Sequence, residues 1–206
     1  MTEAAVAVLA AEASRRRLTV RQVAVVEQLV EAAADEARQQ GYEGMTVRNV
    51  ARRAGVAPAT AYTYFASKDH LLAEVLWRRL QALPEPDPVV DTVPGSGGGS
   101  PAVERVVAEL RVLGLFMAGD PMLAAACTTA LLGSGTEVRT LRVLFGTALR
   151  QRIASALGDD ADEAVLRSLD LAYSGAMLWA GMGHIRFEDV PDALADAARL
   201  VLRGAS

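Results

Sequence analysis

Apolar residues in this chain recur at steps of three and four residues, between short breaks rich in glycine, proline and aspartate. Val20, Val23, Val26 and Val30 illustrate the spacing, which places their side chains on one face of a helix. No segment alternates apolar and polar residues beside a hairpin turn, so no strand is expected. The sequence therefore predicts an all-α fold.

The breaks also predict where the helices begin and end. Thr19 and Thr46 can cap helix N-termini, Pro58 suits a first helical turn, and Gly41 and Gly55 can close the helices before them. One short helix of two turns is expected between Thr46 and Gly55. The other expected helices span residues 19–40, 58–64, 67–83, 102–118, 121–132, 136–157, 162–185 and 189–203.

Composition and charge exclude several classes of protein. Hydrophobic residues make up 51% of the 206 residues, enough for a sizeable core, while the net charge of −4 excludes a globally basic surface. One cysteine and two histidines cannot build a Cys/His zinc cluster, and neither a metal nor a cofactor is expected. The longest uncharged stretch, 121–136, is too short for a membrane span. We expect a cytoplasmic protein without a membrane partner.

Residues 46–65, TVRNVARRAGVAPATAYTYF, predict two short helices joined by a tight turn at Gly55. This arrangement is typical of a helix-turn-helix, which can place its second helix in the major groove of DNA. The stretch 44–68 contains four basic residues and no acidic one, and 14–26 is also basic without acids. A local basic surface of this kind favours contact with DNA phosphates.

The longer run 41–75, GYEGMTVRNVARRAGVAPATAYTYFASKDHLLAEV, resembles the DNA-binding segment of the tetracycline-repressor (TetR) family. The resemblance rests on the Gly-aromatic pair at 41–42, Thr46, the Ala-Gly-Val turn at 54–56, the Tyr-x-x-Phe pattern at 62–65 and Ser-Lys-Asp at 67–69. One position departs from the family pattern, because Ala57 stands where many members have serine. The missing cap should cost about 1 kcal/mol of local stability.

The resemblance implies a role for each matching residue. Thr46 would bind a phosphate, Thr60 and Thr63 would approach base edges, and Lys68 would clamp a second phosphate. Tyr62 and Tyr64 would contact the backbone or thymine methyl groups. The cations expected to add phosphate or minor-groove contacts are Arg48, Arg15, Arg16 and Arg17.

After Pro101 the helices are rich in large apolar side chains, which suit either a core or a pocket for a small molecule. Since members of the resembled family usually enclose an effector here, we expect an apolar or amphipathic effector. The expected ligand-binding residues are Leu113, Phe116, Met117, Cys127, Thr128, Leu131, Phe145, Leu149, Arg152, Tyr173 and Met177.

The resemblance also implies a homodimer that packs through the last two helices, 162–185 and 189–203, and binds a double-stranded DNA operator. Glycines inside the first of these, such as Gly175, would allow close helix approach; the alternative is that the helix frays near its end, with Gly183 as a cap. The expected domains are a flexible basic arm at 1–18, a helix-turn-helix DNA-binding domain at 19–66, a connecting helix at 67–83, a flexible loop at 84–101, and an effector-binding and dimerisation domain at 102–206.

Two other classes of function remain open at this point. An enzyme would need a nucleophile such as Cys127 and a base such as His184, but the apolar run around Cys127 favours an inert buried thiol, so no catalysis is expected. A helical interaction protein that kept the helix-turn-helix shape without binding DNA is the second alternative.

Overall fold

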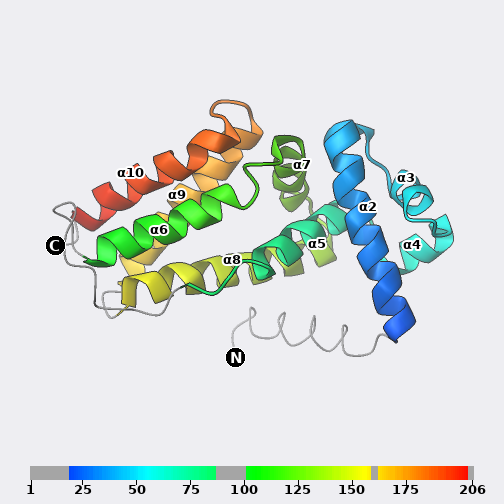
Figure 1. The fold of residues 1–206 in the computed structure, drawn as a ribbon, viewed down its shortest axis with the longest axis horizontal. Helices are drawn as coiled ribbons and strands as arrows, with labels where there is room; N and C mark the ends of the chain where they lie inside the picture. The colour runs from blue at the N-terminus through cyan, green and yellow to red at the C-terminus, as the bar shows by residue number, and fades with distance from the viewer. Residues whose placement is uncertain (1–18, 87–100, 159–161, 204–206) are drawn as a thin grey trace. The chain divides into compact units, whose positions relative to one another are not determined.

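The computed structural model describes residues 19–86, 101–158 and 162–203. All regular elements in these ranges are helical, which confirms the all-α prediction. None of the helices in the described ranges has the length and apolar character needed to cross a membrane. The helices, drawn in Figure 1, are α2 (Val20–Gly44), α3 (Val47–Arg53), α4 (Pro58–Tyr64), α5 (Lys68–Gln81), α6 (Pro101–Leu115), α7 (Pro121–Leu131), α8 (Thr136–Leu157), α9 (Glu163–Gly181), the 3₁₀ helix η2 (Phe187–Asp189) and α10 (Val190–Arg203).

Local signals in the sequence explain how the first helices begin. Thr19 forms a capping box with Gln22: the Gln22 amide donates to Thr19 Oγ1, and the Thr19 amide donates to Gln22 Oε1 at 2.8 Å. Gly41 interrupts α2 with a φ of 65°, a left-handed conformation in which glycine is strongly favoured. The regular part of α2 therefore ends where the sequence predicts, although helical turns continue to Gly44.

Two helices end three or more residues earlier than predicted. α9 stops at Gly181 rather than at residue 185, because Gly183 adopts a φ of 80° and the His184 amide donates back to the Trp179 carbonyl at 2.9 Å. This bond pattern is a glycine-based helix termination. α6 stops at Leu115 rather than at residue 118, and a turn closes there with the Ala118 amide donating to the Leu115 carbonyl.

The described residues form two compact units. Unit 1 contains residues 19–81 and 120–145, so it groups α2, α3, α4 and α5 with α7 and the first part of α8. Within it α3 and α4 lie on one side of α2, and α5 and α7 lie on the other (Figure 1). Its core is built around fully buried side chains such as Leu29, Met45, Leu71, Leu72 and Leu123.

Unit 2 contains the described parts of residues 82–119 and 146–206. α10 packs against α6 and α9, and the second part of α8 joins them through the Arg105 guanidinium, which donates to the Ala156 carbonyl at 3.0 Å. Gly114 of α6 permits a close approach here, since a Cβ on it would lie 3.1 Å from the backbone of Pro191. Leu110, Leu113 and Ile153 are fully buried in this core.

Candidate DNA interface and ligand-binding residues

Two short helices and a glycine turn build the helix-turn-helix. Thr46 caps α3, because its Oγ1 accepts the Asn49 amide at 3.1 Å. The chain reverses at Gly55, whose φ of 67° allows the Val56 amide to donate to the Ala51 carbonyl. α4 then starts at Pro58 behind Ala57, which makes no side-chain cap. The predicted geometry of this segment is confirmed.

α4 divides into a buried and an exposed side. Ala61 and the C-cap residue Phe65 are buried, with 0% and 3% of their surface exposed, and they hold the helix against the core. Thr60, Tyr62 and Thr63 are exposed. Thr63 Oγ1 donates to the Ala59 carbonyl at 3.1 Å, which leaves its oxygen lone pairs available as acceptors. Tyr64 is half-buried beside them. The hydroxyl groups that the sequence singles out therefore line the solvent side of α4.

The basic residues around the turn differ in their partners. Arg48 is exposed, and no ion pair joins it to any residue of the described ranges. Arg53 instead forms an ion pair with the buried Glu36 of α2, with Nε 2.9 Å from Oε2, and also donates to Gln39. Arg53 thus connects α3 to α2, and its contacts stabilise the fold. Arg15, Arg16 and Arg17 lie outside the described residues.

Lys68, predicted to clamp a phosphate, makes internal contacts at the start of α5. Its Nζ donates to the Tyr42 carbonyl at 2.8 Å and lies 3.9 Å from the centroid of the Tyr42 ring. The Tyr42 hydroxyl donates to Asp69 at 2.6 Å, and burial together with this carboxylate raises the pKa of Tyr42 to about 12. Ser67 caps α5 by accepting the His70 amide. An ammonium has three donors, so the contact with Tyr42 leaves Lys68 able to bind a phosphate.

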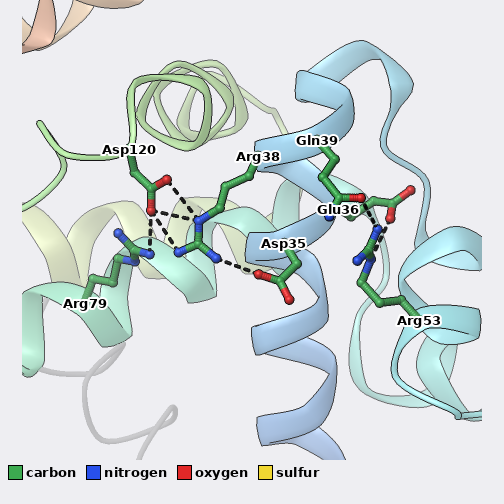
Figure 2. Close-up of polar contacts among 7 residues, drawn as sticks. All are labelled: Asp35, Glu36, Arg38, Gln39, Arg53, Arg79 and Asp120. Carbon is green, nitrogen blue, oxygen red and sulfur yellow. Dashed lines mark hydrogen bonds and ion pairs between the residues drawn. The ribbon is translucent and has the colours of Figure 1, made fainter.

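A second polar cluster joins α2 to α5 and to the start of α7 (Figure 2). The Asp120 carboxylate accepts from Arg38 of α2, with both oxygens 2.9 Å from Nε, and from Arg79 of α5 at 3.0 Å. The hydrogen bond from Arg38 is the largest influence on the pKa of Asp120, which lies below its ordinary value. Asp120 occupies the N-cap position of α7 but makes no cap bond there. Its carboxylate serves a contact between elements rather than its own helix.

The predicted ligand-binding residues divide between the two units. In unit 1, Cys127 is buried, its Sγ lies 3.5 Å from the Leu72 carbonyl oxygen, and burial raises the pKa of the thiol to about 12. Thr128 is half-buried and donates to the Ala124 carbonyl of its own helix. Phe145 is buried and Leu131 is half-buried in the same unit.

In unit 2 the predicted polar residues already have protein partners. Tyr173 is buried, which raises the pKa of its hydroxyl, and it donates to the Leu113 carbonyl at 3.3 Å. Arg152 pairs with the buried Glu109 at 2.6 Å and donates to the Pro84 carbonyl. Sequence reasoning missed Glu109, because the pair spans 43 positions of the chain. The apolar members of the prediction in this unit are buried or half-buried: Leu113, Phe116, Met117, Leu149 and Met177.

Comparisons with known proteins agree with this geometry. A sequence model for bacterial regulatory proteins of the tetR family matches residues 29–75, which hold the helix-turn-helix. A helix-turn-helix transcriptional regulator of Mycobacterium tuberculosis is 40% identical over 188 residues, covering 90% of this chain and 84% of that protein.

Two solved structures share the fold. A TetR transcriptional regulator from Rhodococcus sp. RHA1 has a TM-score of 0.71 and 24% identity, covering 91% of this chain and all of the other. FadR of Thermus thermophilus, a TetR-family repressor solved with lauroyl-CoA, has a TM-score of 0.57 and 21% identity, covering 87% and 94%. Sequence and fold together show that the chain belongs to the TetR family of bacterial transcriptional regulators.

Proposed function

We propose that the protein is a homodimeric repressor that binds a palindromic operator and leaves it when an apolar or amphipathic small molecule binds. The observation that carries the proposal is the solvent side of α4, where Thr60, Tyr62 and Thr63 are exposed while Ala61 and Phe65 anchor the helix. Hydroxyl groups on a short exposed helix suit contacts with phosphates and base edges.

In this proposal the residues of the helix-turn-helix have separate roles. Thr60 and Thr63 face base edges, while Tyr62 and Tyr64 contact the backbone or thymine methyl groups. Phosphates are bound by the remaining residues, Thr46, Arg48 and Lys68, together with Arg15, Arg16 and Arg17. Because Arg48 has no ion pair within the described residues, it enters the contact without first losing a carboxylate partner.

The effector side of the proposal is supported by chemistry and by similarity. A TetR-family repressor of the same fold binds lauroyl-CoA, whose acyl chain is apolar and whose head is polar. The proposed contacts are the eleven ligand-binding residues that the sequence predicts. The effector weakens operator binding only if it favours a state in which the two recognition helices have a different spacing.

The dimer is supported by an apolar surface in unit 2. Leu171 and Trp179 of α9 are 68% and 58% exposed, and Leu200 of α10 is 69% exposed. Gly175 lies between them on α9, and a Cβ on it would have no atom within 4 Å in this chain. A second copy of the chain would cover these side chains, and its two-fold symmetry would match a palindromic operator.

The test is a selection of genomic fragments with the purified protein, followed by fluorescence anisotropy on the enriched site. Thr63→Ala should weaken binding about tenfold and relax the preference at one base pair. Thr140→Ala is the matched control, because Thr140 Oγ1 also donates to the carbonyl four residues earlier, at 3.1 Å, but on α8. The proposal would be wrong if the folded protein enriched no site and its binding to DNA fragments did not become tighter at low salt. That result would favour the alternative of a helical interaction protein that does not bind DNA.

A further inference from the structure

A buried indole in α5 lacks a hydrogen-bond partner. Trp77 is 7% exposed, and its Nε1 is fully buried without an acceptor among the residues that the structure describes. Buried polar groups of proteins are nearly always paired, and a buried tryptophan usually finds an acceptor for its N–H. The exception therefore needs a physical explanation at this position.

The surroundings along α5 do not offer an acceptor. One turn earlier, the Glu74 carboxylate accepts from Arg78 Nε at 2.8 Å, and this pair is already formed. The residues on either side of Trp77 along the helix surface, Ala73 and Leu80, are apolar and buried. A trapped water would need two to four polar partners, which Ala73 and Leu80 do not provide. The Trp77 N–H is thus a buried donor to which the described residues offer no acceptor.

We propose that Trp77 is a ligand-binding residue that donates its Nε1–H to an oxygen of the effector. The inference rests on the proposed function and narrows the chemistry of the effector. A pure hydrocarbon would leave the donor unpaired, so the effector carries an acceptor, such as a carbonyl or carboxylate oxygen, next to an apolar body. An apolar body with a few fixed polar contacts is the usual composition of a small-molecule site.

This assignment adds α5 to the ligand-binding elements. None of the eleven residues that the sequence predicts lies on α5, which directly follows the helix-turn-helix. α5 packs against both α2 and α7 in unit 1, and Leu72 of α5 accepts from Cys127 of α7. A ligand held by Trp77 would therefore contact an element that packs directly onto α2, and α2 in turn packs against α3 of the helix-turn-helix.

The chain has two tryptophans, so a ¹⁵N-labelled sample gives two indole signals, and Trp179→Phe assigns them. The probe is lauroyl-CoA, and coenzyme A without the acyl chain is its control. We expect lauroyl-CoA to move the Trp77 indole proton downfield, as formation of a hydrogen bond would, while coenzyme A leaves it in place. The Trp179 indole, more than half exposed, reports non-specific effects.

Two replacements separate the donor from the shape of the side chain. Trp77→Phe should weaken lauroyl-CoA binding about tenfold, the usual effect of one lost hydrogen bond. Since phenylalanine also leaves a void, the second replacement is the benzothiophene isostere of tryptophan at position 77, in the Trp179→Phe background. It keeps the ring size and removes the N–H, and it should weaken binding to the same extent.

The outcomes distinguish the inference from the proposed function. If lauroyl-CoA releases operator DNA while the Trp77 signal and the affinity of both replacements stay unchanged, the assignment of Trp77 is wrong and the effector proposal stands. If the Trp77 signal moves without release of DNA, Trp77 binds the ligand and the proposed control of DNA binding is wrong. If lauroyl-CoA neither binds nor releases DNA, the acyl class of effector is wrong, and the assignment of Trp77 to it is overturned.

Discussion

At the scale of single residues, the Asp120 carboxylate connects parts of the chain that are distant in sequence. It accepts from Arg38, 82 positions earlier, and from Arg79, 41 positions earlier, and its side chain is 24% exposed. We expect Asp120→Asn to lower the free energy of unfolding at pH 7 by about 1–2 kcal/mol, because these bonds are charge-assisted and partly shielded from water. Urea denaturation measures the change.

The same pair of arginines predicts a dependence on pH. In the folded protein, their hydrogen bonds lower the pKa of the Asp120 carboxyl below its ordinary value of 3.8. A depressed pKa means that the stabilisation is complete above the pKa of the unfolded chain and is lost as the pH falls through the folded value. The gap between wild type and Asp120→Asn should therefore narrow only below about pH 4. Asp192→Asn is the control, because Asp192 also pairs with an arginine, Arg111, but is 78% exposed. Equal losses of unfolding free energy in the two variants would contradict the prediction.

Cys127 gives a second prediction at this scale. Only the thiolate reacts with electrophiles, and burial raises the pKa of this thiol to about 12. We expect native protein at pH 8 to resist a thiol-labelling reagent for as long as it stays folded, and to label fully in denaturant. Thr129 is exposed two positions further along α7, so Cys127→Ala with Thr129→Cys should label at once. Rapid labelling of Cys127 in the native state would overturn the prediction.

At the scale of the helix, α4 begins without a hydrogen bond from a side-chain cap. Thr46 and Ser67 cap α3 and α5, whereas Ala57 offers α4 no side-chain acceptor although its ψ of 137° suits an N-cap. Ala57→Ser should raise the free energy of unfolding by about 1 kcal/mol. Ala59→Ser, exposed inside the same helix, should give no gain because a serine there has no free amide to accept. Urea titrations that fail to separate the two variants would refute the role of the cap.

Short-range signals explain why the helices were predictable and the contacts between them were not. Thr19, Thr46 and Gly55 act on neighbours within a few positions, so their effects can be inferred from the sequence. The end of α9 was misplaced because the apolar pattern continues past Gly181, although Gly183 stops the helix. The unpaired indole of Trp77 depends on what surrounds it in three dimensions, and periodicity carries no information about that.

At the scale of the whole molecule, the two compact units do not follow chain order. α7 and the start of α8 come after α6 in sequence but belong to the same unit as α2, α3, α4 and α5, and α7 packs against α2 and α5. Four of the residues proposed to bind the effector therefore share a unit with the helix-turn-helix: Cys127, Thr128, Leu131 and Phe145. In the proposed mechanism these residues act on α2 through the packing of α7 against it, and the hydrogen bond from Arg38 of α2 to Asp120, the N-cap residue of α7, is part of that packing.

The dimer proposal makes the last prediction, since operator affinity depends on two linked recognition helices. A charge at Leu171 or Trp179 would be desolvated without a partner if a second copy covered α9, so Leu171→Glu and Trp179→Glu should give monomers in sedimentation velocity. Linked sites bind far more tightly than single ones, and operator affinity should fall about 100-fold or more. Leu132→Glu is the control, because Leu132 is equally exposed at 68% but lies at the end of α7 in unit 1. If all three variants sediment as dimers and bind the operator as the wild type does, α9 does not form the interface.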